Sequence, residues 1–168
     1  MLSHADLLSH LFWISAYHTH NPRTPAKAFR KADGKTPYEI HPIWCAMTIL
    51  HEMTLPEEIR TRGAIVLLYH DVLEDTTAVP TFQIDEITRE QIEQMTFASN
   101  AAEMEEVWDR PRIIWLYKLY DKVSNLMSSS FMDSEKIARH KAYLRRLVVE
   151  VEKDYPELNI IKLAKALL

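Results

Sequence analysis

The chain has 168 residues, of which 47% are hydrophobic and 2 are glycine, and its formal net charge is −4. A negative protein is not a general binder of polyanions. The single cysteine, Cys45, excludes an intramolecular disulfide and a zinc site built from cysteines. No apolar stretch approaches the roughly 20 residues that span a bilayer. We therefore expect one compact domain, 1–168, and scarce glycine with apolar residues at helical spacing favours an all-α helical bundle. The N-terminus lacks a signal-peptide pattern, so we expect a cytoplasmic protein.

A first helix is predicted to start at Ser3 or Asp6 and to end near His20, because Pro22 and Pro25 follow. Its histidines, which are His4, His10, His18 and His20, are expected to be surface or capping residues.

Residues 21–40 are predicted to form a loop with one short helical turn around 26–30. The loop is basic, which suits either an anionic small molecule, such as a phosphorylated one, or a simple solvated loop. Its positive side chains are Arg23, Lys27, Arg30, Lys31 and Lys35.

Pro42 fits the first turn of the next helix, which is expected to extend to about Met53. His41 would then be held rigidly at the helix start, as a metal ligand must be, although a lone histidine there is more often a cap. Another helix is predicted from about Leu55 through the apolar run 64–68 and into residues 70–76.

The polar end of that helix carries His70, Asp71, Glu74 and Asp75. Residues three and four apart share a helical face, so one face is predicted to gather an imidazole and three carboxylates. Such a crowd repels itself unless a cation is present, and imidazole with carboxylates is an ordinary ligand set for a divalent metal. The alternative is a polar helix end with the acids in solvent.

The second half of the chain is also predicted to be helical. Residues 81–109 read as two amphipathic helices with a break near Ser99, and their acids are expected to form a solvated face. Pro111 opens a helix that is apolar nearly all round and is therefore expected to be central. Asp121 lies within it and must be paired, protonated or bound to a metal, and Lys118 is a candidate partner. The helices of residues 133–168 are expected to be packing elements or an oligomer surface, and His140 has no motif around it.

Three segments together resemble the (p)ppGpp hydrolase domain of the Rel/SpoT proteins, which belongs to the HD metal-dependent phosphohydrolases. They are Pro37-Tyr38-Glu39-Ile40-His41-Pro42, His70-Asp71-Val72-Leu73-Glu74-Asp75-Thr76 and Lys118-Leu119-Tyr120-Asp121-Lys122-Val123-Ser124-Asn125-Leu126. The resemblance covers about residues 24–128. Because 168 residues leave no room for a nucleotide-synthetase domain, the nearest comparison is with stand-alone small alarmone hydrolases.

The resemblance implies a role for each matching residue. The ligands of one Mn²⁺ ion would be His41, His70, Asp71 and Asp121, and the acid/base and water-positioning pair would be Glu74 and Asp75. Substrate-binding residues would be Arg30, Lys31, Tyr38, Asn125 and Ser128.

The implied reaction removes pyrophosphate from the 3′ position of guanosine tetra- or pentaphosphate, which converts ppGpp into GDP. The partner would be a small nucleotide rather than a nucleic acid or a membrane, and the protein could form a homo-oligomer. Two alternatives stay open at this point. One is an HD phosphohydrolase for a deoxynucleotide monophosphate or for the phosphate of NADPH, and the other is a non-catalytic nucleotide sensor.

Overall fold

The computed structural model describes residues 3–78 and 84–168, and within them every regular element is helical, which confirms the all-α prediction. The elements are α1 (His4–His20), η1 (Pro25–Ala28), α2 (Ile40–Leu50), α3 (Glu57–Tyr69), α4 (Val72–Asp75), α5 (Glu86–Met95), α6 (Asn100–Glu106), η2 (Val107–Asp109), α7 (Arg112–Met127), α8 (Ser134–Asp154) and α9 (Asn159–Leu167).

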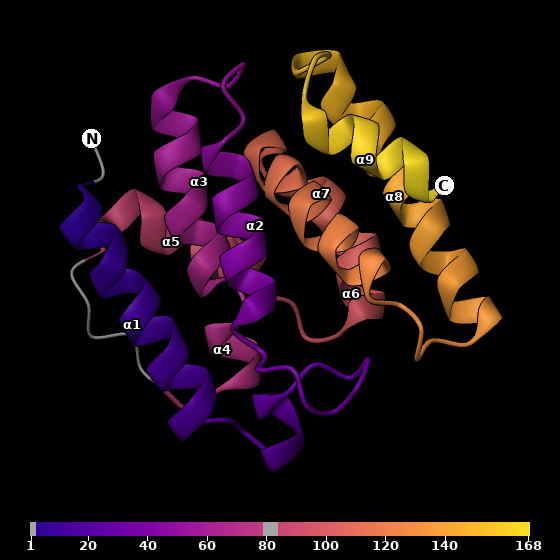
Figure 1. Ribbon diagram of the computed structural model, residues 1–168. Coiled ribbons are helices and arrows are strands. Elements are labelled where there is room, and N and C mark those ends of the chain that lie inside the picture. Colours follow the sequence, from indigo (N-terminus) through magenta and orange to yellow (C-terminus); the bar gives the residue numbers. More distant parts are fainter. Residues whose placement is uncertain (1–2, 79–83) are drawn as a thin grey trace.

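Helix α7 is the centre of the bundle, as its apolar sequence predicts. It packs against α2, α3, α5, α8 and α9, with α1 on one side of the molecule and α8 and α9 on the other (Figure 1). Leu116, Leu119 and Val123 are fully buried. Polar residues of α7 are buried as well, among them Asp121. The Asp121 carboxylate therefore lies in the interior of the protein, because neighbouring helices cover α7 on several sides.

Helices α2, α3 and α7 meet at Gly63 of α3. A Cβ atom at this position would lie 2.7 Å from Ile49 Cδ1 and 2.7 Å from Tyr117 Cε1. Such distances are well inside van der Waals contact, so the close approach of the three helices requires a glycine here. Helices α2 and α7 both carry predicted ligands, and this packing sets how far apart those ligands stand.

The basic loop is fastened to the turn that carries the predicted catalytic acids. Arg23 N donates to Asp75 O at 2.9 Å, and Thr77 N donates to Asn21 O at 2.8 Å. Farther along, Tyr38 N donates to Ala28 O at 2.9 Å. The first two bonds fasten the loop to the residues that end and follow α4, while most of residues 21–38 stay exposed, as expected for a solvated loop.

The segment from His70 to Asp75 differs from the prediction of one continuous helical face. Helix α3 ends at Tyr69, and α4 is a separate single turn that begins at Val72. His70 Nδ1 lies 2.7 Å from Leu67 O, which can only accept, so the ring donates to that carbonyl. An imidazole that satisfies a carbonyl of the last turn substitutes for the next backbone donor, and the helix ends there.

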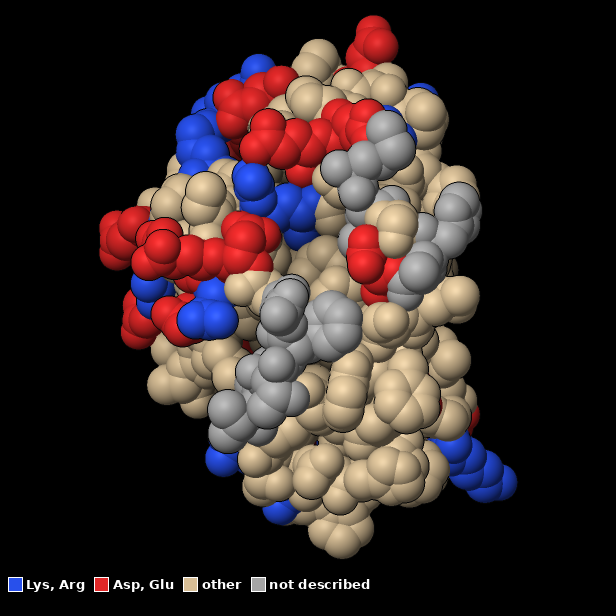
Figure 2. Space-filling view, turned by 90° about the vertical axis from the view of Figure 1, so that its left-hand side faces the viewer, with Lys and Arg blue, Asp and Glu red and all other residues tan. Residues whose placement is uncertain are grey.

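Helix α1 presents an uncharged face to solvent. Its sequence contains one acidic residue, Asp6, and no lysine or arginine. Leu8 and Phe12 are each 67% exposed. Figure 2 shows this side of the molecule, where charged side chains gather in the upper part and the lower part is largely free of them.

Two histidines of α1 are not surface or capping residues, so that prediction was wrong for them. His10 and His18 are both buried. The ring of His18 packs on the ring of Tyr38, with centroids 4.9 Å apart. Both histidines are on the side of α1 that the rest of the bundle covers.

No helix in the described part of the chain is both long enough and apolar enough to cross a membrane.

Candidate metal centre and substrate pocket

The four predicted metal ligands converge in the interior from three different elements. His41 is in the first turn of α2, His70 and Asp71 are at the break between α3 and α4, and Asp121 is in the middle of α7. His41 Nε2 lies 3.5 Å from Asp71 Oδ2 and 3.3 Å from Asp121 Oδ1. His70 Nε2 lies 3.1 Å and 3.8 Å from the same two oxygen atoms.

The two imidazoles are oriented by their other nitrogen atoms. His70 donates through Nδ1 to Leu67 O, and His41 Nδ1 lies 2.8 Å from Ser124 Oγ. Neither Nε2 atom makes a hydrogen bond with the described residues, although both are buried. Ligand atoms of His41, His70 and Asp121 lie within 4.8 Å of one another. Buried imidazole nitrogens that face carboxylates and are fixed from behind suit a divalent cation.

The electrostatics of this cluster favour a positive charge at its centre. Burial raises the pKa of Asp71, but the imidazoles of His70 and His41 outweigh it and hold this pKa well below its usual range. Burial lowers the pKa of His70, but the charge of Asp71 and the close approach of the Asp121 and Asp71 carboxylates outweigh it and raise the pKa to about 10. Binding of a metal ion at Nε2 would therefore compete with binding of a proton by His70.

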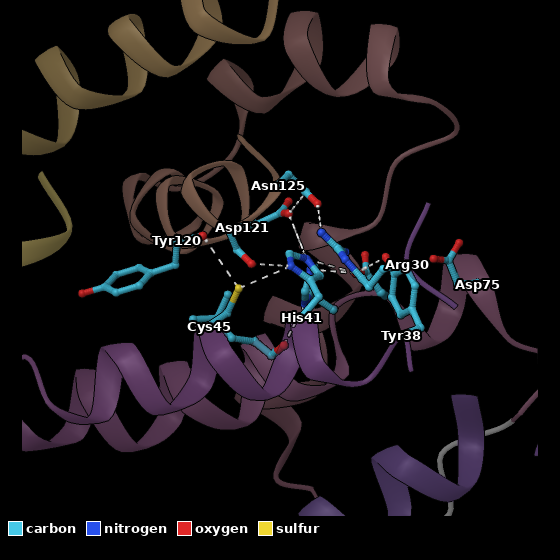
Figure 3. A network of polar contacts seen from close by, with 12 residues as sticks. Arg30, Tyr38, His41, Cys45, Asp75, Tyr120, Asp121 and Asn125 are labelled. Atoms are coloured by element: carbon cyan, nitrogen blue, oxygen red, sulfur yellow. Dashed lines mark hydrogen bonds and ion pairs between the residues drawn. The ribbon is translucent and has the colours of Figure 1, made fainter. Parts of the chain in front are cut away.

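Several predicted substrate-binding residues contact the ligands directly. Tyr38 donates its hydroxyl to Asp71 Oδ2 at 2.7 Å, and Asn125 donates from Nδ2 to Asp121 Oδ1 at 2.6 Å. Arg30 Nη2 donates to Asn125 Oδ1 at 3.1 Å and to Ser128 Oγ at 2.8 Å. In Figure 3, Arg30 is stretched between Asn125 and the face of Tyr38. Hydrogen bonds therefore connect Asp71 to Tyr38 and Asp121 through Asn125 to Arg30, and the stacking of Arg30 on Tyr38 joins the two sets.

Glu74 and Asp75 line the pocket beside Asp71. Glu74 Oε1 accepts from Phe97 N at 2.9 Å. Burial and then the charge of Asp71 raise the pKa of Glu74 above its ordinary value. Asp75 is buried and forms an ion pair with Lys27. One carboxylate therefore has a raised pKa, which favours a role in proton transfer, while its neighbour is held in place by a cation.

The pocket has a volume of about 150 Å³ and a wall that carries six cations against five carboxylates. A second hollow, about 340 Å³, shares Lys27, Glu74 and Asp75 with it. If a divalent cation is added at the ligand cluster, the wall becomes distinctly positive, as binding of phosphate groups requires. The six cations are Lys27, Arg30, Lys31, Lys118, Lys122 and Lys136, and the five carboxylates are Asp71, Glu74, Asp75, Glu103 and Asp121.

The predicted carboxylates and substrate-binding residues all line this pocket except Ser128, which lines a neighbouring hollow with Arg30 and His41. The two histidine ligands do not line the pocket and lie in the cluster behind Asp71 and Asp121. The roles assigned to these residues stay predictions.

Lys27, Lys136 and His140 line the pocket, although their sequence surroundings did not indicate it. The sequence indicates Lys27 only as one residue of a basic loop. Helix α8 was expected to have only a packing or oligomer role, but Lys136 and His140 are on its first two turns.

Glu103 is an exception to the expectation that the acids of residues 81–109 form a solvated face, since the other acids of this segment are exposed. Its carboxylate is 5% exposed and pairs with Lys118 at 3.2 Å and Lys122 at 2.8 Å. Lys118 Nζ also lies 3.5 Å from Asp121 Oδ2, and Lys122 Nζ lies 3.1 Å from the same oxygen. The pairing of Asp121 with lysine and its approach to the two imidazoles therefore coexist, since each involves a different oxygen.

The fold is similar to that of a solved structure described as a metazoan ortholog of SpoT that hydrolyzes ppGpp and plays a role in starvation responses. The TM-score is 0.71 and the sequence identity is 18%, and the similarity covers 99% of this chain and 96% of that chain. No family model and no curated protein matches the sequence. At this identity the similarity establishes the fold, and it confirms at that level the resemblance to the Rel/SpoT hydrolase domain.

Proposed function

We propose that this protein is a metal-dependent phosphohydrolase that removes pyrophosphate from the 3′ position of guanosine tetra- or pentaphosphate, converting ppGpp into GDP. The observation that carries the proposal is the convergence of two buried imidazole Nε2 atoms with two carboxylates beside a pocket walled by cations. The description of the similar solved structure as a protein that hydrolyzes ppGpp supports the choice of substrate.

The ligand set fits one divalent cation, which we propose to be Mn²⁺. His41, His70, Asp71 and Asp121 would hold it, because imidazole nitrogen and carboxylate oxygen are donors that such ions accept. When bound, the ion supplies Lewis acidity for a phosphoryl oxygen and lowers the pKa of water.

The remaining chemistry falls to the side chains of the pocket. Glu74 in its ionised form accepts a proton from the attacking water, and its raised pKa lets it return that proton to the departing 3′ oxygen. Asp75, held by Lys27, orients the water. Water attacks the phosphorus atom that is bonded to the 3′ oxygen. The bond between that phosphorus and the 3′ oxygen breaks, which leaves a 3′ hydroxyl on GDP and releases pyrophosphate.

Cations of the pocket other than Lys118 and Lys122 bind the phosphate groups. Arg30 is held in one position by Asn125, Ser128 and the face of Tyr38, so little of its freedom is lost on binding. Lys31 and Lys136 line the same pocket from the loop and from α8. Lys118 and Lys122 are already paired with carboxylates, and we assign them no contact with substrate.

The test is release of pyrophosphate from ppGpp by purified protein loaded with Mn²⁺. Release is expected to disappear in Asp71→Ala and on addition of a chelator. Asp109→Ala, the same change at an exposed position, is expected to leave release unchanged. Hydrolysis of a panel of deoxynucleotide monophosphates and NADPH tests the alternative substrates. Turnover of one of these in place of ppGpp would overturn the substrate assignment, and metal binding with no turnover on the whole panel would favour a sensor.

A further inference from the structure

Asp121 uses its two oxygen atoms for two different purposes. Oδ1 faces His41 Nε2 at 3.3 Å and accepts from Asn125 at 2.6 Å. Oδ2 faces away from the imidazoles and meets Lys122 Nζ at 3.1 Å and Lys118 Nζ at 3.5 Å. Two ammonium groups beside one carboxylate give a net charge of +1. This positive charge opposes binding of a cation at Oδ1.

Glu103 supplies the charge that balances this pair of lysines. Its Oε2 accepts from Lys122 Nζ at 2.9 Å and from Lys118 Nζ at 3.2 Å. Asp121, Lys118, Lys122 and Glu103 then form a neutral cluster of two cations and two anions, in which each side chain is almost entirely buried. Because none of these side chains is more than 5% exposed, ions from solvent compensate poorly for a missing member.

We propose that Glu103 is a positioning residue for the metal centre, which acts by neutralising Lys118 and Lys122 so that their positive charge, behind Asp121, does not oppose binding of the metal ion. The proposal rests on the metal site of the proposed function but not on the identity of the substrate. Glu103 comes from α6, a helix outside the segments that carry the predicted ligands, and it touches none of the four ligand side chains through a hydrogen bond in the described residues.

A purely structural role for Glu103 predicts a different pattern from an electrostatic one. If the cluster only holds α6 against α7, removing any one of its members destabilises the protein. Metal binding is then weakened whether the residue removed is a carboxylate or a lysine. If charge balance matters, removing the carboxylate and removing one ammonium must shift metal affinity in opposite directions. The two roles can therefore be separated without measuring hydrolysis.

The experiment is calorimetric titration of Mn²⁺ into metal-free protein for the wild type and four variants. Glu103→Gln is expected to weaken affinity roughly 10- to 100-fold, the usual range for residues that support metal ligands. Lys118→Met is expected to bind Mn²⁺ at least as tightly as the wild type. The double variant is expected to fall within about threefold of the wild type, because its charge is balanced again. Glu105→Gln is the matched control on the exposed side of α6 and is expected to change nothing.

Thermal unfolding of the metal-free variants is measured in parallel, so that folding and affinity are read separately. If Glu103→Gln does not fold, comparing Lys118→Met with the double variant still tests the proposal. The Lys118→Met protein is expected to bind Mn²⁺ more tightly than the double variant. Wild-type affinity in Glu103→Gln, or weaker binding in Lys118→Met, would overturn the role of Glu103. Failure to hydrolyse ppGpp would overturn the proposed function and leave this result standing.

Discussion

Replacing Tyr38 with phenylalanine removes a single hydroxyl group that supports a predicted metal ligand. That hydroxyl donates to Asp71 Oδ2 at 2.7 Å. A hydrogen bond to a charged acceptor contributes about 1.5–3 kcal/mol, which corresponds to roughly 10- to 150-fold in a binding constant. The side chain of Asp71 is 14% exposed, so water can replace part of the lost bond. We therefore expect Mn²⁺ affinity to fall about tenfold, at the lower end of this range.

The assay is calorimetric titration of Mn²⁺, with Tyr155→Phe as the control because Tyr155 is in the turn between α8 and α9, away from the pocket. The sequence resemblance instead assigns Tyr38 to substrate binding. In that case the KM for ppGpp would rise in Tyr38→Phe while Mn²⁺ affinity stayed at the wild-type value. Unchanged Mn²⁺ affinity would show that this hydrogen bond does not support metal binding by Asp71.

Three further outcomes follow from the geometry. Glu74→Gln is expected to lower turnover roughly 10²- to 10⁴-fold while calorimetry shows Mn²⁺ affinity nearly unchanged, and turnover close to wild type would exclude Glu74 as the proton acceptor. Burial and Asp71 raise the pKa of Glu74 above 4.5, and a base must be ionised, so kcat/KM is expected to fall as pH decreases through a value above 4.5. An acid limb below 4.5 contradicts this. Gly63→Ala is expected to destabilise the metal-free protein by about 1–3 kcal/mol in urea titrations, since the new methyl overlaps Ile49 and Tyr117, and undiminished stability would show that the helices can move apart.

Much of the fold could be predicted because its signals are local. Ser3 and Asp133 each accept a hydrogen bond from a backbone amide in the first turn of their helices, as their residue types favour. Proline at 111 directly precedes α7. The nearly continuous apolar sequence of α7 predicts a central helix, and neighbours do surround it. Each of these signals extends over a few residues and needs no knowledge of distant parts of the chain.

The end of α3 was predicted too late because a side chain competes with the backbone there. The apolar run and the polar residues after it suit a continuing helix, and nothing in their spacing marks an end. The ring of His70 takes the carbonyl of Leu67, and this contact depends on the side-chain orientation that the site imposes. His70 and Glu74 therefore reach the pocket from either side of a break rather than from one helical face.

The contacts that could not be predicted join residues far apart in sequence. Glu103 reads as one more acid of an amphipathic helix, and only the packing of α6 on α7 buries it against Lys118 and Lys122. Lys27 reads as one basic residue among several, and only the backbone bonds between the loop and α4 place it on Asp75. Periodicity and motifs carry no information about such pairings.

The most direct test of the metal centre is a crystal structure of the protein grown with Mn²⁺, with anomalous diffraction used to locate the ion. We expect one strong anomalous peak in contact with His41 Nε2, His70 Nε2, Asp71 and Asp121, and its loss in Asp71→Ala crystals grown in the same way. A peak at another place, or none at these four side chains at saturating Mn²⁺, would exclude this metal centre.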